Sequence, residues 1–230
     1  MKKNFSKIAK TIGVKFNNED LLKQAMVHRS YLNEHPKFEL DQNERLEFLG
    51  DAVLELIVTE YLYKGYPNPE GELTNWRASL VNSRMLSKIG ESIGIDDVLY
   101  LSRGEEKDTG KARQAILANA FEALIGAIYL DRGWDAAKNF IHRFVLTELP
   151  EILDKKLYLD PKSNLQELTQ EKIGITPIYR VLSESGPDHA KNFEIGVFLK
   201  NNKIGQGSGS SKQEAQEEAA RNALENEGWK

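Results

Sequence analysis

Apolar residues recur at helical spacing throughout the first two thirds of the sequence, and this period restricts that part of the chain to a helical fold. The repeat is visible in residues 21–27, 46–63, 76–94, 116–130 and 136–149. Gly and Pro separate these segments, as in KGYPNPEG and DRGW. No long stretch before about residue 155 alternates with the two-residue period of a strand. We therefore expect residues 1–153 to form an all-α domain.

The helical pattern is lost at residues 154–161, where Pro161 prevents one continuous helix. We expect this segment to be a linker. Beyond it, the sequence predicts a second and smaller domain of the α+β class over residues 162–230. Its elements are expected in the order α-β-β-β-α.

Local signals in the second domain support that order. Ser163 and Gln166 have the spacing of a capping box and predict a helix that ends near Gly174. Residues 192–199 then alternate between apolar and other side chains, KNNK supplies a hairpin turn, and KIGQGSG supplies a Gly-rich third strand. A second capping box at Ser211 predicts the last helix, which has a face of small residues.

Carboxylates interrupt the apolar segment NERLEFLGDAVLELIV at residues 43–58. Glu44, Glu47 and Asp51 lie at positions i, i+3 and i+7, so they share one face of a helix. Their apolar neighbours predict a helix buried on nearly all sides. An unpaired carboxylate there costs several kcal/mol or takes up a proton, so a cation is expected nearby. In the alternative interpretations, Arg45 or another basic side chain pairs with the acids, or the acid face is turned to water.

A second apolar segment, ILANAFEALIGAIYL, repeats this arrangement with Asn119 and Glu122 at positions i and i+3. Oxygen ligands from two buried helices favour a hard divalent ion, Mg²⁺ or Mn²⁺. The sequence has no Cys and only 4 His, which disfavours zinc. Because Mg²⁺ usually keeps several waters and is completed by substrate phosphate, these residues indicate phosphoryl-transfer chemistry.

Composition narrows the possible environments of the protein. The absence of Cys excludes disulfides and thiolate metal sites, and it fits a cytoplasmic location. Lysines break every apolar run near the N-terminus, so no signal peptide is expected. The apolar run FEALIGAIYL is about half the ~20 residues that a membrane helix needs, so no membrane partner is expected. The net charge of −4 argues weakly against nucleic acid as a partner.

Several of these segments resemble a known family. NERLEFLGDAVL resembles the signature of ribonuclease III, a family of endonucleases that cleave double-stranded RNA. AMVHRSY, PEGELTNWRASLV, LSRGEEK and NAFEALIGAIYLD agree with it, and NLQELTQ, GPDHAKNF and GSGSSKQEAQEEAA resemble a double-stranded RNA-binding domain. The resemblance covers essentially the whole chain and implies the bacterial form, a homodimer with one nuclease domain per subunit. It implies that Phe48 packs into the partner subunit.

The resemblance also assigns roles to the acids. It implies that Glu47, Asp51 and Glu122 are the catalytic residues and ligands of Mg²⁺, for which Mn²⁺ can substitute. Glu44 and Glu70 match acids that the family places near the cleavage centre in supporting roles. The implied reaction is hydrolysis of the phosphodiester, which leaves 5′-phosphate and 3′-hydroxyl ends. Processing of rRNA and mRNA precursors is the implied setting.

Asn119 departs from the family pattern, which has an acid three residues before Glu122. Its amide oxygen can still act as a metal ligand, but it brings no charge. At ~4 Å the gross attraction between one carboxylate and a divalent ion is roughly 2 kcal/mol in a water-like dielectric and roughly 8 at an effective dielectric of 20. The loss of metal affinity caused by Asn119 could therefore be small or could abolish activity, and the sequence alone does not decide between them.

RNA binding by the second domain must depend on the placement of charges, because residues 160–230 contain 9 Lys and Arg against 11 Asp and Glu. The resemblance implies RNA contacts from Gln166, Glu167, His189, Ser211 and Lys212. Such contacts would reach 2′-hydroxyls in two minor grooves and phosphates across the major groove between them. Alternatively, Gln166 and Glu167 only cap their helix, and His189 is a solvated loop residue.

A second departure lies at the start of the last helix, where the family's paired lysines become Lys212 and Gln213. We expect a weaker phosphate contact there, and therefore a shallower salt dependence of RNA affinity. Taken together, the sequence favours a metal-dependent endoribonuclease for double-stranded RNA. The alternatives are a double-stranded RNA-binding protein whose nuclease centre is impaired by Asn119, and a helical metal phosphohydrolase that acts on nucleotides.

Overall fold

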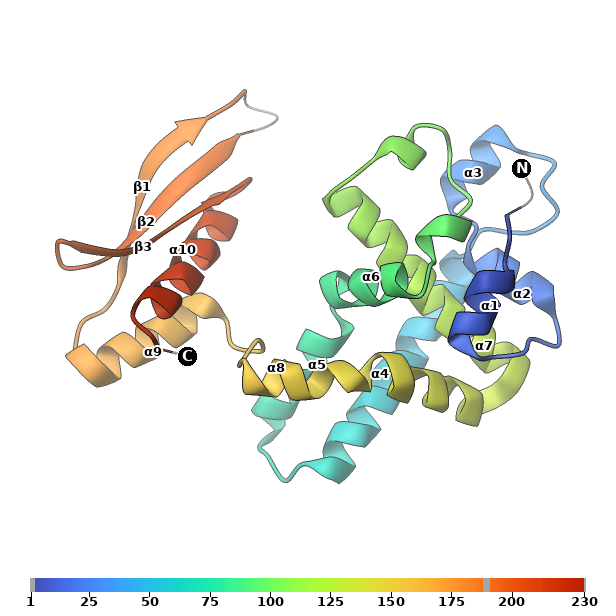
Figure 1. Ribbon diagram of the computed structural model, residues 1–230, viewed down its shortest axis with the longest axis horizontal. Helices are drawn as coiled ribbons and strands as arrows, with labels where there is room; N and C mark the ends of the chain where they lie inside the picture. The colour runs from blue at the N-terminus through green and yellow to red at the C-terminus, as the bar shows by residue number, and fades with distance from the viewer. Residues whose placement is uncertain (1–2, 188–190, 230) are drawn as a thin grey trace. The chain divides into compact units, whose positions relative to one another are not determined.

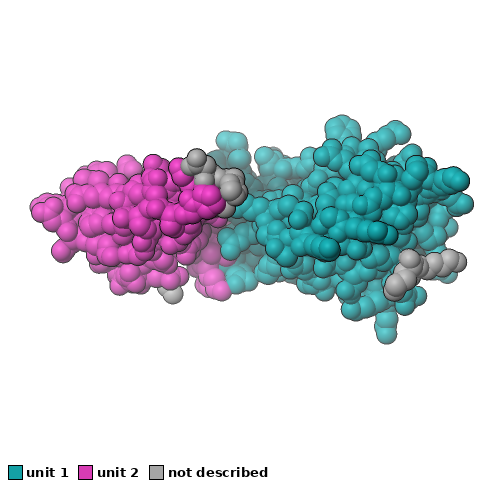
Figure 2. Space-filling view, turned by 90° about the horizontal axis from the view of Figure 1, so that it is seen from above, with its two compact units in different colours: residues 1–152 teal, residues 153–230 magenta. Residues whose placement is uncertain are grey.

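The computed structural model describes residues 3–187 and 191–229 (Figure 1). The chain divides into two compact units, Met1–Ile152 and Leu153–Lys230, which Figure 2 shows in different colours. Among the described residues, no helix is long and apolar enough to cross a membrane.

The first unit is built from helices, as the sequence period predicts, apart from an isolated backbone bridge between Val27 and Tyr100. Its α-helices are α1 Ser6–Ile12, α2 Glu19–Ala25, α3 Arg29–Glu34, α4 Glu44–Gly65, α5 Glu70–Val81, α6 Ser83–Ser92, α7 Lys111–Phe144 and α8 Leu149–Asp154. Short 3-10 turns lie at η1 Asp96–Val98, η2 Glu105–Lys107 and η3 Leu146–Glu148. The helix α7 contains a break at Gly133, whose φ of 78° lies in the left-handed region.

The core of this unit is centred on the crossing of α4 and α7, where two glycines bring the backbones into contact. A Cβ atom built on Gly50 would lie 1.8 Å from the carbonyl oxygen of Glu122. One built on Gly126 would lie 2.2 Å from the carbonyl oxygen of Leu46. Only glycine fits at either position, because any side chain would overlap main-chain atoms of the other helix. Leu54 and Phe121 are fully buried beside this contact.

The helix α4 is not buried on nearly all sides, so that expectation is wrong. Leu46, Val53 and Ile57 face the core, but Phe48 is 82% exposed and Tyr63 is 78% exposed. The sequence pattern could not separate the two sides, because apolar side chains occupy both. One side of α4 packs inside this chain, and the other leaves large apolar groups on its surface.

The second unit has the predicted order of elements, α9 Pro161–Ile173, β1 Ile178–Ser185, β2 Asn192–Leu199, β3 Asn202–Gly209 and α10 Lys212–Asn226. The strands form an antiparallel sheet in the order β1-β2-β3. Leu165 of α9 and Val197 of β2 share a buried core with the small residues of α10. The Gly-rich strand allows this packing, because a Cβ on Gly207 would lie 2.3 Å from the backbone nitrogen of Ala219.

The predicted helix caps of the second unit have different outcomes. Ser211 caps α10 by accepting a hydrogen bond from the Glu214 backbone N–H at 3.2 Å, which confirms that cap. The capping box at Ser163 is wrong, because α9 begins at Pro161 and Asp160 is its cap, accepting from the Ser163 N–H at 2.9 Å. A proline at the first helical position loses no hydrogen bond. Gly174 ends α9 with a φ of 70°, as predicted.

Candidate active site

The glycine contact between α4 and α7 positions the predicted site. Because the two backbones touch at Gly50, the turns of α4 and α7 that carry the predicted acids lie against each other. Glu47 and Asp51 come from α4, and Asn119 and Glu122 come from α7. The Asn119 side chain forms a hydrogen bond with Glu47.

Burial and like charge govern the protonation of these carboxyls. Burial, and after it the negative charges of Asp51, Glu47 and Glu55, together raise the pKa of Glu122 to about 8. The pKa of Glu47 is also raised, first by burial and then by the charge of Glu44, while the hydrogen bond from Asn119 opposes this shift. The site therefore favours bound protons or a bound cation over a set of bare carboxylates.

No basic side chain neutralises the central acids. Among the residues that the structure describes, Glu47, Asp51 and Glu122 form no ion pair, and neither does Arg45. The alternative in which Arg45 pairs with the acids is therefore wrong, whereas pairing with another basic side chain holds for Glu44 alone among the three acids of that face, since Arg29 lies 3.8 Å from it. The alternative of a solvated acid face holds in part, because Asp51 is exposed, whereas Glu47 and Glu122 are half-buried. The acids lie at the border between the core and the surface.

The donor set fits a hard divalent cation by its chemistry. Three carboxylates without basic partners repel one another, and the Asn119 amide adds a neutral oxygen. Carboxylate and amide oxygens are the protein ligands that Mg²⁺ and Mn²⁺ prefer. Within residues 3–187 and 191–229, no three His, Asp or Glu side chains are already gathered as a metal cage.

Glu44 and Glu70 occupy different surroundings. Glu44 is exposed at the start of α4 and lies 3.8 Å from Arg29 of α3. Glu70 begins α5, where its carboxylate accepts a hydrogen bond from the Thr74 hydroxyl at 3.2 Å. Glu70 is not among the charges that act on Glu47 or Glu122. It lines a separate pocket of about 650 Å³ that also includes Tyr63.

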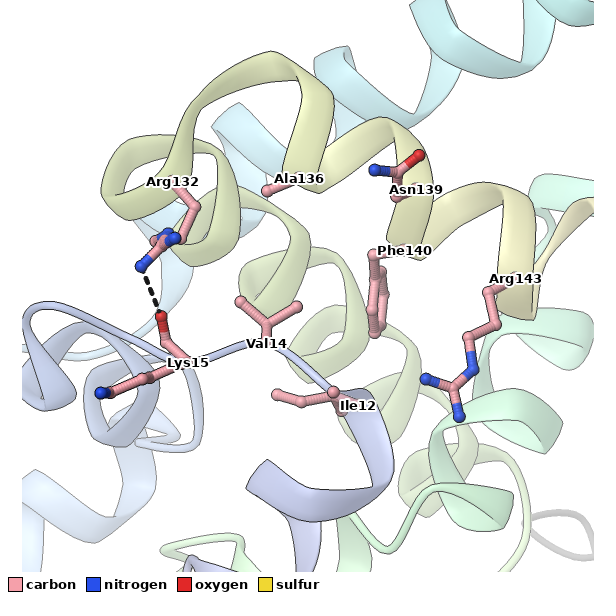
Figure 3. Close-up of a pocket in the computed structure, with 9 residues that line it drawn as sticks. Ile12, Val14, Lys15, Arg132, Ala136, Asn139, Phe140 and Arg143 are labelled. Atoms are coloured by element: carbon pink, nitrogen blue, oxygen red, sulfur yellow. Dashed lines mark hydrogen bonds between the residues drawn. The ribbon is translucent and has the colours of Figure 1, made fainter.

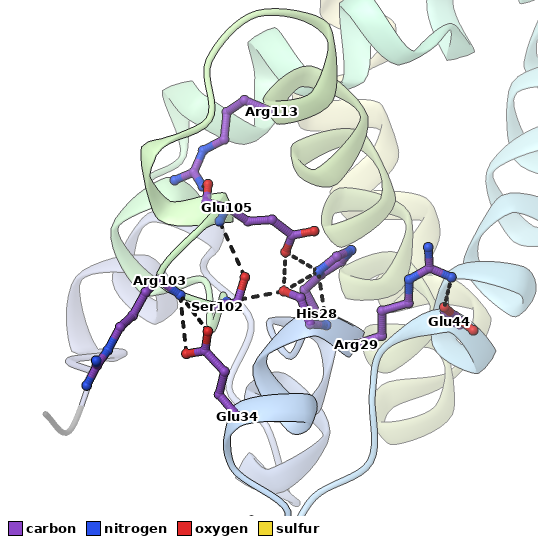
Figure 4. A network of polar contacts seen from close by, with 9 residues as sticks. His28, Arg29, Glu34, Glu44, Ser102, Arg103, Glu105 and Arg113 are labelled. Carbon is purple, nitrogen blue, oxygen red and sulfur yellow. Dashed lines mark hydrogen bonds and ion pairs between the residues drawn. The ribbon is translucent and has the colours of Figure 1, made fainter.

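A polar network that the sequence reasoning missed lies at the start of α3, next to the Arg29–Glu44 pair (Figure 4). The Nδ1 atom of His28 lies 2.8 Å from a Glu105 carboxylate oxygen, and the Ser30 hydroxyl also donates to that carboxylate. The backbone N–H of Ser102 donates to the Ser30 hydroxyl at 3.1 Å. The network ties the loop around Glu105 to the start of α3. Because serine and glutamate meet the same ring nitrogen, it holds the loop in place and does not form a nucleophile–base–acid triad.

A buried asparagine, also missed, fixes the start of α4. Asn43 is 2% exposed, and its side chain donates to the Ala25 carbonyl oxygen at 3.1 Å. Its backbone N–H donates to the Val27 carbonyl oxygen at 2.9 Å. These bonds attach the first turn of α4 to the end of α2. The sequence signal was an asparagine directly before an apolar helix, which is read more easily as a cap.

The predicted RNA-binding residues that the structure describes lie on α9 and at the start of α10. Gln166 and Glu167 are exposed on α9 and line a shallow hollow of about 380 Å³. Because Asp160 caps α9, the alternative in which they cap the helix is wrong. Lys212 begins α10, where its ammonium group lies 3.2 Å from the Glu184 carboxylate of β1. His189 lies outside the described residues.

Comparison with known proteins identifies the family. Residues 18–149 match the family described as Ribonuclease-III-like, and residues 161–227 match the double-stranded RNA binding motif. The chain is 43% identical to Ribonuclease 3 of Streptococcus gordonii over 228 residues, which is 99% of this chain and 98% of that protein. The chain belongs to the ribonuclease III family. As a member of the ribonuclease III family, it is an endoribonuclease.

Other relatives agree with this assignment. Ribonuclease 3 of Wolinella succinogenes is 44% identical over 217 residues, which cover 94% of this chain and 89% of that protein. The solved nuclease domain of ribonuclease III from Campylobacter jejuni is 39% identical, with a TM-score of 0.57, over 64% of this chain and 99% of that one. The interpretation as a nucleotide phosphohydrolase loses its support, because residues 161–227 match an RNA-binding motif.

Proposed function

We propose that this ribonuclease III family member cleaves double-stranded RNA in a reaction that depends on Mg²⁺ or Mn²⁺, and that it leaves 5′-phosphate and 3′-hydroxyl ends. Processing of rRNA and mRNA precursors in the cytoplasm is the proposed setting. We divide the chain into a nuclease domain at residues 1–153, a linker at 154–161 and an RNA-binding domain at 162–230. The observation that carries the proposal is the set of three acids at the α4–α7 crossing, Glu47, Asp51 and Glu122, which have no basic partner among the described residues and in which the charges of Glu47 and Asp51 raise the pKa of Glu122.

Glu47, Asp51 and Glu122 would hold the divalent ion, with Asn119 as a neutral donor. When bound, the ion supplies positive charge that polarises the phosphodiester and lowers the pKa of water. Glu122 holds a proton at neutral pH without the ion, because its pKa is about 8. Glu122 would release this proton when the divalent ion binds, because the positive charge of the ion stabilises the carboxylate. The amide of Asn119 donates to Glu47 and so orients that carboxylate.

Residues outside this group would have supporting roles. Arg29 lies 3.8 Å from Glu44, so it can keep that acid oriented at the edge of the site. We also propose Glu70 as a supporting acid, although its side-chain hydrogen bond in this chain is with Thr74 of its own helix. In the second unit, the exposed Gln166 and Glu167 are available for 2′-hydroxyls in the minor groove. We propose that Ser211 and Lys212 contact RNA phosphates.

A homodimer is part of the proposal. Phe48 is 82% exposed, Tyr63 78% and Leu56 58%, and all three lie on α4. Large apolar groups gathered on one surface are typical of protein interfaces. The description of the Campylobacter jejuni nuclease domain refers to a region of that protein involved in dimer formation. A monomeric mass by sedimentation at micromolar concentration would contradict this part of the proposal.

The test is cleavage of a long RNA duplex with Mg²⁺ and with EDTA. Glu122→Gln should reduce the cleavage rate by about 10³-fold or more, since it removes one charge from the proposed ion site, and should leave duplex affinity unchanged. Glu91→Gln is the matched control, because Glu91 is an exposed acid of α6 outside the site. Activity retained by the Glu122 variant would refute the assignment of this carboxyl.

A second candidate function is double-stranded RNA binding without efficient cleavage, and Asn119 is the observation that favours it. In this case the protein shifts a duplex without cutting it. Asn119→Asp would then restore cleavage and lower the Mg²⁺ concentration needed for half-maximal rate. Asn201→Asp, an equal change of charge in the β2–β3 hairpin, should have no effect. If the natural protein already cleaves at low Mg²⁺ concentration, this candidate is excluded.

A further inference from the structure

A pocket separate from the acid group lies between the end of α1 and the part of α7 that follows Gly133 (Figure 3). Its volume is about 270 Å³. Ile12, Val14, Ala136 and Phe140 form its apolar lining. None of the residues that line it belongs to the acid group at the α4–α7 crossing.

The polar lining of this pocket is cationic. Lys15, Arg132 and Arg143 line it together with Asn139, and no carboxylate does. The chain as a whole has a net charge of −4, so such a concentration of positive charge is local. Within the described part of the chain, Lys15 and Arg143 form no ion pair. Their charges are therefore available to a ligand.

Contacts within the protein hold the two guanidinium groups at the pocket. One Nη atom of Arg132 donates to the Lys15 carbonyl oxygen at 2.9 Å and to the Asn17 side-chain oxygen at 3.1 Å. The Arg143 guanidinium lies 4.8 Å from the centre of the Phe144 ring. A Cβ on Gly13 would lie 2.9 Å from an Arg143 nitrogen, so the missing side chain of Gly13 makes room for this guanidinium. Positive groups held in this way lose little freedom when they bind an anion.

We propose that this pocket binds a small phosphate monoester with a compact uncharged body, of the size of a mononucleotide or a sugar phosphate. Guanidinium groups match phosphate oxygens with paired hydrogen bonds, and the apolar lining can hold the uncharged part. A volume of about 270 Å³ is slightly below the roughly 300–1,000 Å³ of sites for drug-sized molecules, which restricts the ligand to a small one. An RNA duplex presents phosphates but no apolar group that could enter the pocket.

The experiment titrates the full-length protein with adenosine 5′-monophosphate by calorimetry in metal-free buffer, so that the acids near Glu122 do not attract the phosphate. Inorganic phosphate and adenosine are titrated separately. The monophosphate should bind more tightly than either part. Arg143→Gln and Lys15→Gln should each weaken its binding by about tenfold. Lys10→Gln is the control, because Lys10 is an exposed lysine of α1 that does not line the pocket.

Lys15→Gln should not affect folding, because the exposed Lys15 side chain makes no hydrogen bond or ion pair with the described residues. A loss of binding in this variant therefore reports on the pocket alone. Duplex cleavage by both variants should equal that of the natural protein, because neither residue belongs to the proposed nuclease centre. Equal affinity of the natural protein and both variants for the monophosphate would overturn the proposal. So would variants that lose duplex RNA affinity and leave monophosphate binding unchanged, since the cations would then serve the RNA backbone.

Discussion

Glu122 is a half-buried acid of the proposed site, and its surroundings change its protonation. It projects from the interior helix α7, and burial together with the charges of Asp51, Glu47 and Glu55 raises its pKa to about 8. At neutral pH the group is therefore mostly protonated in the metal-free protein. A proton held there can be exchanged for a divalent cation, so metal binding should release protons and strengthen as the pH rises.

The pH dependence of stability follows from this shift. The folded-state pKa of about 8 lies above the ordinary value of 4.5, so the unfolded chain ionises first. The contribution of protonated Glu122 to stability is complete below pH 4.5 and is lost as the pH rises through about 8. We expect the Tm of the metal-free protein to fall over this interval, in thermal melts with EDTA at fixed ionic strength.

Glu122→Gln isolates this contribution. The amide cannot ionise, so the Tm of the variant should fall less between pH 4.5 and 8 than that of the natural protein. Glu91→Gln should keep the natural pH dependence, and added Mg²⁺ should reduce it. Parallel Tm curves for the natural protein and the Glu122 variant would contradict the raised pKa.

At the scale of elements, the α4–α7 crossing supports both the core and the site. Gly50→Ala would place a methyl group on the Glu122 carbonyl, where only movement of one helix can relieve the overlap. We expect a loss of unfolding free energy of roughly 3 kcal/mol or more, measured by denaturant unfolding. Gly65→Ala is the matched control at the other end of α4, because a Cβ there meets nothing within 4 Å. A Gly50 variant as stable as the control would refute the tight crossing.

The elements themselves could be predicted from sequence because their signals are local. Helical spacing identified α4 and α7, and strict alternation identified β2. The contact between Gly50 and Gly126 could not be predicted, since it joins positions far apart in the chain through main-chain atoms. The start of α9 was misplaced because two polar residues, Asp160 and Ser163, both have cap chemistry, and tertiary context decided between them.

The candidate site was predictable to different extents for different residues. The carboxyls on α4 and α7 were found because acids in apolar helices are costly, and the family resemblance gave them roles. The resemblance also grouped Glu70 with them, but the structure places its side-chain contact on its own helix. The network of His28, Ser30 and Glu105 was missed, because its members are separated in sequence and each is ordinary alone.

At the scale of the whole molecule, the excess of acidic residues makes RNA affinity depend on a few placed cations. Residues 160–230 hold 9 Lys and Arg against 11 Asp and Glu, and Lys212 is already 3.2 Å from Glu184. In the proposed RNA contact of Lys212, phosphates would compete with this carboxylate for the lysine. The protein should therefore release few counterions on binding and show a shallow salt dependence.

Gln213→Lys tests this balance. The added lysine should tighten duplex binding at low salt and steepen the slope of log K against log [salt] by up to about 0.9. The gain has an upper limit, because residue 213 faces Glu217, to which Gln213 now donates at 2.9 Å. Asn201→Lys adds the same charge in the β2–β3 hairpin and should change the slope less. Equal slopes for the natural protein and the Gln213 variant would refute the prediction.

The contact of Gly50 with the Glu122 carbonyl has a consequence for how such a chain can diverge. Main-chain atoms, and not flexible side chains, set the separation of the two helices that carry the acids. Substitutions on the outer faces of these helices should then leave the distance between the two backbones unchanged. The spacing of the two helices that carry the acids therefore depends on Gly50 and Gly126, neither of which has a Cβ atom.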